Sequence, residues 1–121
     1  MSTILIIDDS PTELHLFQNM LEKNGFETLV ADNGEAGIKL ALSAKPDCIL
    51  MDVVMPGMNG FQATRKLSQD PVTGTIPVII ITTKDQETDK IWGMRQGAVE
   101  YLVKPINEKQ LISMINAVMA A

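Results

Sequence analysis

The sequence predicts an α/β fold, a doubly wound sheet of five parallel strands with five helices on both faces. Short apolar runs, bounded by turn residues, alternate five times with segments whose apolar residues recur at helical spacing. Each connection is long enough for a helical crossover, which parallel pairing requires. We expect the strand order 2-1-3-4-5, because it places the first and third strands where the winding of the chain reverses.

The first two strand–helix units have well-marked boundaries. The run Ile4–Ile7 predicts a strand, and Ser10 as N-cap with Glu13 as its capping-box partner predicts a helix directly afterwards. An Asn-Gly pair stops this helix. Residues 27–31 predict the second strand, and residues 34–44 predict the helix that follows it.

The third unit is built on residues 48–52, an apolar run that ends in a carboxylate. A short apolar run bounded by turn residues is typical of a strand buried on both faces. A loop with one proline and glycines separates it from the helix predicted over residues 60–69. Phe61, Thr64 and Leu67 should share one face of that helix.

The last two units differ in the strength of their signals. Residues 78–81 form the most strand-like run in the chain, whereas the polar segment 84–95 predicts a weaker helix that Gly97 ends. Residues 101–103 predict the fifth strand. Asn107 is then expected to cap the last helix.

Composition and charge set the class of protein. With 121 residues, 45% of them hydrophobic and 21% charged, the chain suits one domain over residues 1–121. A net charge of -5 argues against nucleic acid or an anionic membrane as a partner. No stretch approaches the roughly 20 apolar residues of a membrane span, and no leader is visible, so we expect a cytoplasmic protein. The single cysteine, Cys48, fits a reducing compartment and should be a small buried hydrophobe.

Polar residues fall where the predicted strands end. Asp8 and Asp9 follow the first strand, and Asp52 ends the third; Thr82 and Lys104 end the fourth and fifth. Because the carboxyl ends of parallel strands share one edge of the sheet, these side chains should converge. Three neighbouring carboxylates repel one another unless a cation compensates them. Oxygen ligands favour a hard divalent ion, so the sequence predicts a Mg²⁺ site.

A carboxylate beside Mg²⁺, a lysine and a hydroxyl suits phosphoryl transfer. Asp52 can attack phosphorus as a nucleophile and form an acyl phosphate. The metal and Lys104 would neutralise charge on the phosphoryl oxygens, and Thr82 could donate a hydrogen bond to one of them. A single polar residue at a strand end often means only contact with water, but polar residues at four of five strand ends favour a site.

The chain resembles bacterial response-regulator receiver domains from end to end. The matching residues are Asp8-Asp9, Asp52 with Met55-Pro56 and Gly60, Thr82, and Lys104-Pro105. The resemblance implies that Asp52 accepts phosphate from the histidine of a sensor kinase. It also implies that Asp9, Asp52 and the Val54 carbonyl ligate Mg²⁺ directly, while Asp8 acts through a bound water. Lys104 would pair with the acceptor carboxylate and then with the phosphoryl group.

The resemblance also implies which residues change conformation on phosphorylation and which ones set the lifetime of the phosphorylated state. Thr82 would move toward the phosphoryl group and Tyr101 would turn inward, remodelling the face of the fourth helix, fifth strand and fifth helix. Trp92 lies in that region and could either pack the helix or meet a partner. Val54 and Thr83 should flank the path of attacking water, where Val54 cannot orient it and Thr83 is bulky. We therefore expect slow self-dephosphorylation unless a partner assists, and a signalling domain rather than an enzyme.

Three segments resemble more closely the stand-alone receivers of chemosensory systems that control type IV pilus twitching motility. They are residues 8–13, 58–65 and 83–90. This resemblance implies a chemotaxis-type histidine kinase as phosphodonor. It leaves open whether the output is contact with a protein effector or a phosphate sink. Since the sequence stops one helix after Lys104-Pro105, we expect no output domain. The acidic surface and the polar fourth helix are compatible with a monomer or a weak dimer.

Three alternatives make different demands on the sequence. A scaffold that is never phosphorylated would not need Asp9, Asp52, Thr82 and Lys104 together. A flavodoxin-like cofactor protein would need a phosphate-binding loop after the first strand, where two aspartates would repel the phosphate. A metal-dependent phosphatase commonly carries a second aspartate two residues after its nucleophile, and that position holds Val54.

Overall fold

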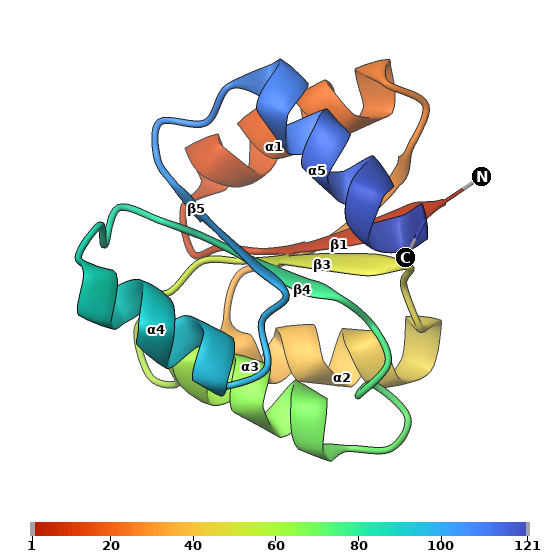
Figure 1. The fold of residues 1–121 in the computed structure, drawn as a ribbon. Coiled ribbons are helices and arrows are strands. Elements are labelled where there is room, and N and C mark those ends of the chain that lie inside the picture. Colours follow the sequence, from red (N-terminus) through yellow and green to blue (C-terminus); the bar gives the residue numbers. More distant parts are fainter. Residues whose placement is uncertain (1, 121) are drawn as a thin grey trace.

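Strands and helices alternate five times along the chain (Figure 1). The computed structural model describes residues 2–120. Its strands are β1 (Thr3–Ile7), β2 (Glu27–Ala31), β3 (Cys48–Met51), β4 (Val78–Thr82) and β5 (Glu100–Val103). Its helices are α1 (Pro11–Lys23), α2 (Gly34–Ala44), α3 (Gly60–Gln69), α4 (Glu87–Arg95) and α5 (Glu108–Ala120).

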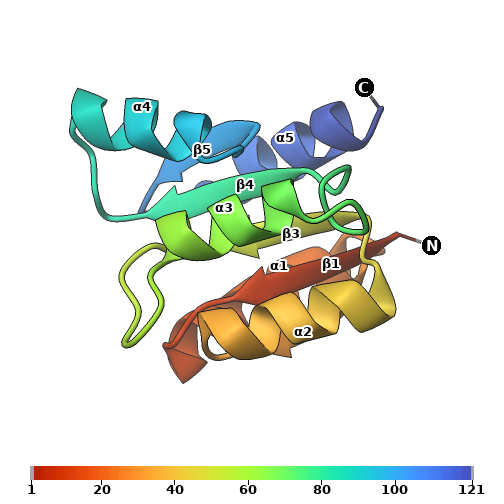
Figure 2. The ribbon, with the colours of Figure 1, turned by 90° about the horizontal axis from the view of Figure 1, so that it is seen from below.

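The five strands form one sheet in the order β2-β1-β3-β4-β5, and every pairing is parallel. Helices α1 and α5 cover one face, and α2, α3 and α4 cover the other (Figures 1 and 2). The chain begins at β1, adds β2 on one side, and then crosses back to add the remaining strands on the other side. The predicted fold class and strand order are confirmed, with β1 and β3 adjacent where the winding reverses.

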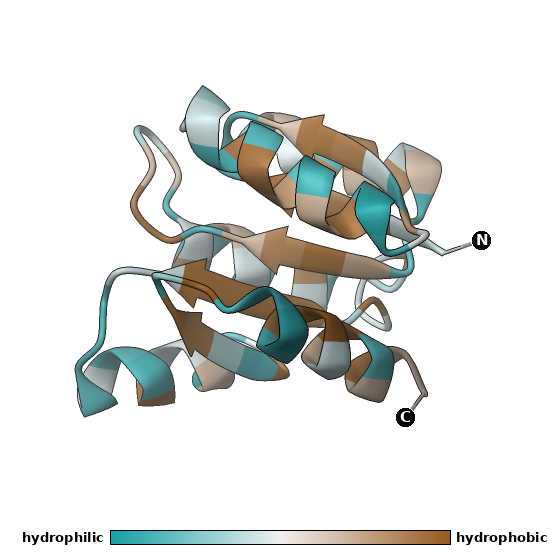
Figure 3. Cartoon of the chain, turned by 90° about the horizontal axis from the view of Figure 1, so that it is seen from above, coloured by the Kyte–Doolittle hydropathy of each residue, from teal (hydrophilic) through white to brown (hydrophobic). Residues whose placement is uncertain are grey.

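Alternate residues of the central strands supply the two halves of the core. Ile4 and Ile6 pack with apolar residues of α1 and α5, whereas Leu5 and Ile7 pack with residues of α2 and α3. Hydrophobic residues accordingly concentrate on the strands, between helices of mixed character (Figure 3). Burial on both faces explains why these strands read as unbroken apolar runs rather than as alternating patterns.

Cys48 opens β3 inside this core. Its side chain is fully buried, and burial raises the pKa of the thiol to about 12. The thiolate is the reactive form of cysteine, so this thiol is chemically quiet in the folded protein. The prediction of a buried structural cysteine is confirmed.

The fourth helix begins later than predicted. The sequence predicts a helix from Lys84, whereas α4 begins at Glu87. The Lys84 amide donates to the Thr82 hydroxyl oxygen at 3.3 Å, and the Gln86 amide donates to the Asp89 carboxylate at 3.3 Å. The first bond offers the backbone at Lys84 an alternative to a helical turn, and the second belongs to a capping box that makes Gln86 the N-cap and so starts α4 at Glu87.

The start of α1 differs from the predicted capping box. The Ser10 hydroxyl oxygen accepts from the Glu13 amide at 3.3 Å, as predicted. The Ser10 amide, however, donates to Asp8 Oδ1 at 2.9 Å, and the Glu13 carboxylate lies 3.3 Å from Lys104 Nζ. The second half of the predicted capping box is therefore wrong, because Asp8 takes the donor that Glu13 would need.

Thr64 lies on the buried face of α3 with Phe61 and Leu67, as predicted. Its hydroxyl oxygen is buried and has no hydrogen-bond partner among residues 2–120. A buried hydroxyl without a partner costs free energy. We expect Thr64→Val, which keeps the shape of the side chain, to raise the free energy of unfolding by about 1 kcal/mol in urea denaturation.

Ser68 on the same helix provides the matched control. Its hydroxyl donates to the Gln96 carbonyl at 2.9 Å, so Ser68→Ala removes a bond that is made and should lower stability. If Thr64→Val were destabilising as well, the Thr64 hydroxyl would have a partner in solution.

Helix length bears on membrane insertion. The longest helices among residues 2–120 have 13 residues. A bilayer requires roughly 20 apolar residues in helical form. In this part of the chain no helix meets the requirement.

Candidate functional site

Three polar residues stand one position beyond the ends of their strands. In each case the backbone amide donates to the carbonyl of the last residue of the neighbouring strand. These bonds join Asp8 to Ala31 (3.1 Å), Asp52 to Ile7 (2.9 Å) and Lys104 to Thr82 (2.8 Å). The sheet ladder thus continues into the site and fixes the backbone from which these three side chains project.

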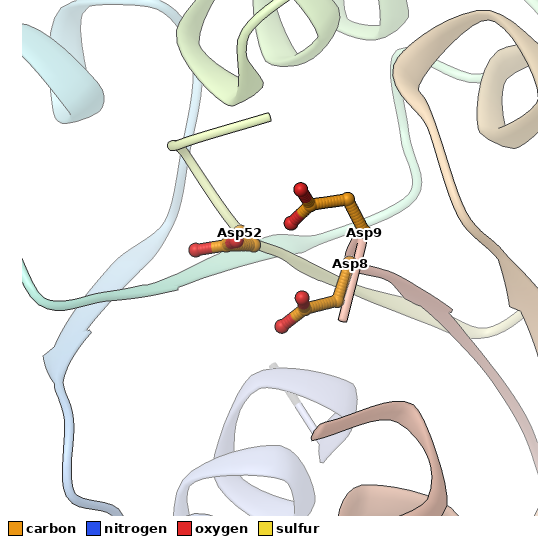
Figure 4. Close-up of side chains that lie close together, drawn as sticks. All are labelled: Asp8, Asp9 and Asp52. Atoms are coloured by element: carbon orange, nitrogen blue, oxygen red, sulfur yellow. The ribbon is translucent and has the colours of Figure 1, made fainter. Parts of the chain in front are cut away.

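The three predicted carboxylates meet at the ends of β1 and β3 (Figure 4). One oxygen from each of Asp8, Asp9 and Asp52 lies within 4.8 Å of the others. Asp8 and Asp52 are 2% and 8% exposed, whereas Asp9 is exposed to solvent. An all-oxygen donor set with one open side fits a hard divalent cation that keeps water ligands, which is the preference of Mg²⁺.

Lys104 faces the carboxylates from β5. Its Nζ lies 3.2 Å from Asp8 Oδ2, 3.3 Å from Glu13 Oε1 and 3.8 Å from Asp52 Oδ1. Burial by itself would lower the pKa of Lys104, but the charges of Asp52, Asp8 and Glu13 together raise it. The lysine is therefore a fixed cation. The expected pairing with Asp52 is present at the longest of the three distances, and the closest partner is Asp8.

Asp52 is a weaker acid than an ordinary aspartate. Burial raises its pKa from 3.8 to about 6, and the negative charge of Asp8 adds to the effect. The Lys104 charge and the backbone amide of Val53 act in the opposite direction without cancelling it. The ionised carboxylate is thus held where water solvates it poorly. A bound cation or a bond to phosphorus would lower the free-energy cost of keeping its negative charge there.

The two predicted switch residues share a partner. Thr82 is fully buried at the end of β4, where its hydroxyl oxygen accepts from the Lys84 amide, and the Tyr101 hydroxyl donates to the Lys84 carbonyl at 2.9 Å. The Tyr101 ring packs against α4 at Gly93, where a Cβ atom would lie 3.1 Å from the ring. The backbone of Lys84 therefore connects the buried threonine to the aromatic ring on the neighbouring strand.

The remaining predicted residues lie at the rim of the site. Val54 and Thr83 are both exposed, each following a buried strand end. Trp92 on α4 is 49% exposed, so about half of its surface packs against the protein and the other half faces solvent.

Glu13 is the site residue that the sequence reasoning missed. The sequence predicts only a capping role for it, although α1 begins at Pro11, three residues after Asp8. Glu13 lies in the first turn of α1, and α1 starts at the edge of the site. A glutamate at that place can reach Lys104, which follows β5. That topological proximity was the available signal.

The sequence profile of the response regulator receiver domain matches residues 4–116. The chain belongs to the response-regulator receiver family. Protein PilH of Pseudomonas aeruginosa is 61% identical to this receiver over 120 residues, which cover 99% of both chains. The response regulator PleD of Caulobacter vibrioides is 39% identical over 114 residues, and the match covers 94% of this receiver but only 25% of PleD.

Solved structures agree with this assignment. A response regulator from Chloroflexus aurantiacus superposes with a TM-score of 0.95 at 30% identity, covering 99% of this receiver and 98% of that chain. The chemotaxis protein CheY4 of Vibrio cholerae gives a TM-score of 0.92 at 30% identity and covers 98% of both chains. The protein is thus a receiver of the two-component type, a class that works with histidine kinases.

Proposed function

We propose that this receiver is phosphorylated on Asp52 by a chemotaxis-type histidine kinase, with Mg²⁺ as cofactor. The observation that carries the proposal is the convergence of three carboxylates and one largely shielded lysine at the carboxyl edge of the sheet. A structural adaptor would gain nothing from placing the nearly buried Asp8 and Asp52 beside Lys104, since an ion pair taken out of water rarely stabilises a fold.

Each residue has a role in the proposed transfer. An oxygen of Asp52 forms a bond to phosphorus while the bond between phosphorus and the donor histidine nitrogen breaks. Lys104 would neutralise negative charge on the transferred group, and Thr82 would donate a hydrogen bond to it. The bound Mg²⁺, held by Asp9, Asp52 and the Val54 carbonyl with Asp8 acting through water, would supply further compensation of negative charge. At neutral pH an Asp52 pKa of about 6 leaves the nucleophile mostly ionised.

The mass of the intact protein tests this proposal. After incubation with acetyl phosphate and Mg²⁺, we expect the native chain to gain one phosphoryl group. Neither the Asp52→Asn variant nor the native chain in excess EDTA should gain it. Labelling of Asp52→Asn to the native extent would remove Asp52 from its role. If acetyl phosphate failed to label the native chain, the same test with a chemotaxis-type kinase would separate a kinase-restricted receiver from the unphosphorylated scaffold.

The output face follows from the shared contact of the switch residues. Movement of Thr82 toward a phosphoryl group would break its bond to the Lys84 amide, and Lys84 also holds the Tyr101 hydroxyl. The change would thereby reach β5, which carries Tyr101, and α4, which packs against the Tyr101 ring at Gly93. We propose that this face signals by protein contact, or that the receiver drains phosphate from the kinase, within a chemosensory system controlling type IV pilus twitching motility. The support for that system is the 61% identity to PilH.

The lifetime of the phosphorylated state is the second property to measure. Val54 offers no polar group to orient attacking water, and Thr83 adds bulk beside the path, so self-dephosphorylation should be slow. We expect the phosphoryl mass to persist for minutes or longer after acetyl phosphate is removed. Val54→Asn should shorten it, because an amide can position water, and Lys66→Asn on the surface of α3 should leave it unchanged. Loss within seconds from the native protein would contradict the assignment of these flanking residues.

A further inference from the structure

Helix α3 begins directly against the backbone of the proposed phosphoacceptor. The amide of Gly60, the first residue of the helix, donates to the Val53 carbonyl at 2.9 Å. A capping box holds this start in place: the Asn59 side chain accepts from the Gln62 amide at 2.9 Å, and the Gln62 side chain accepts from the Asn59 amide at 3.0 Å. The end of a helix is thereby fixed to the segment that follows Asp52.

This contact leaves no room for a side chain at Gly60. A Cβ atom there would overlap the Asp52 carbonyl oxygen and lie 2.8 Å from both the Asp52 carbonyl carbon and the Val53 Cα. Those are main-chain atoms, which cannot rotate aside as a side chain can. At Gly37, by contrast, the crowded atoms are the far end of the Ile7 side chain. Among the glycines of residues 2–120, Gly60 is the one whose substitution would press on the Asp52 backbone.

We propose that Gly60 is a positioning residue for phosphoryl transfer to Asp52. Its missing side chain lets the first turn of α3 abut the Asp52–Val53 peptide and so sets where the Asp52 carboxylate lies relative to Lys104. The inference rests on the proposed function, since it concerns the same carboxylate. Any side chain at this position separates the helix from the strand end and displaces the nucleophile.

The substitution Gly60→Ala tests the proposal. On helix propensity alone the change is favourable, because alanine stabilises a helical position relative to glycine. We expect the rate of labelling by acetyl phosphate at saturating Mg²⁺ to fall by about a hundredfold, the loss that a displacement near 1 Å can cause. The Mg²⁺ concentration for half-maximal labelling should rise as well, since Asp52 is also a proposed ligand. Rates are compared at a temperature where circular dichroism shows each variant fully folded.

Gly74 provides the matched control beyond the other end of α3. Its amide donates to the Asp70 carbonyl at 2.7 Å, and a Cβ atom would lie 2.9 Å from that oxygen. Gly74→Ala therefore also crowds a backbone carbonyl, but far along the chain from Asp52. Its labelling rate and Mg²⁺ dependence should remain those of the native protein whatever its melting temperature.

A second pair of variants decides the matter if Gly60→Ala does not fold. Asn59→Ala loosens the start of α3 without adding atoms, and Asn33→Ala removes the equivalent cap of α2, whose side chain accepts from the Ala36 amide at 2.8 Å. We expect Asn59→Ala to slow labelling roughly threefold to tenfold, the effect of losing one cap, and Asn33→Ala to leave the rate unchanged.

The outcomes separate the two proposals. A native chain that is never labelled, even by a kinase, overturns the proposed function and this inference with it. A native chain that is labelled, with a folded Gly60→Ala labelled at the same rate, overturns the inference alone. If Gly60→Ala is unfolded, equal rates for Asn59→Ala and Asn33→Ala overturn it. Slow labelling of the variants near Asp52, with unchanged rates in both controls, supports it.

Discussion

Lys104→Met is expected to lower the free energy of unfolding of the metal-free receiver by about 3 kcal/mol at neutral pH. The Lys104 Nζ lies within 4.0 Å of three carboxylates, and its side chain is only 13% exposed. Methionine preserves the length of the side chain but leaves the carboxylate of Asp8, which is 2% exposed, without its cation. Urea denaturation in EDTA measures the loss.

The control for this prediction is a lysine in an exposed ion pair. Lys23 lies 3.0 Å from Glu108, closer than any partner of Lys104, but its side chain is 67% exposed. Because solvent screens such pairs, Lys23→Met should leave the urea midpoint unchanged within error. A Lys104→Met variant as stable as Lys23→Met would show that the three carboxylates do not depend on the lysine. Added Mg²⁺ should restore part of the stability lost in Lys104→Met, since it supplies the missing positive charge.

Asp52→Asn is expected to stabilise the metal-free protein, and only above a definite pH. In the folded protein the Asp52 pKa is about 6, against an ordinary value of 3.8 in the unfolded chain. Between these values the unfolded chain loses the proton that the folded protein keeps, so stability falls as pH rises and stays reduced above pH 6. Asparagine removes this penalty, with a gain at neutral pH of up to about 3 kcal/mol.

A pH series of urea denaturations in EDTA checks both the size and the sign. The stability difference between Asp52→Asn and the native protein should vanish below about pH 3, where the carboxyl is protonated in both states. Asp32→Asn replaces an exposed aspartate after β2 at the same edge of the sheet and serves as the control for the substitution itself. A gain that is equal at all pH values would point to packing rather than to the charge of Asp52.

The parts of the site that topology governs were predictable from the sequence. A strand buried on both faces is recognisable as an apolar run, and parallel strands bring their carboxyl ends to one edge. The positions of Asp8, Asp52 and Lys104 follow from these two rules, without knowledge of any side-chain contact. The backbone bonds that anchor each of them one residue past a strand end are the structural form of the same rule.

The parts that depend on competition between side chains were not predictable in this way. Glu13 could have completed a capping box, but the Ser10 amide is taken by Asp8 and the glutamate turns to Lys104. The late start of α4 has a similar origin, in bonds from the Lys84 and Gln86 amides. In each case a short polar side chain competes locally for a backbone amide, and at Glu13 the distant Lys104 supplies a second competing partner.

The buried thiol of Cys48 gives the receiver an internal reporter of its own unfolding. Because the single cysteine lies inside the sheet with a pKa near 12, alkylating reagents can reach it only in molecules that have opened. The rate of its alkylation under native conditions therefore follows the population of open molecules. Every variant discussed above could be ranked in stability without denaturant. A cysteine introduced on the surface could also be tagged selectively with a fluorophore while Cys48 is left in place.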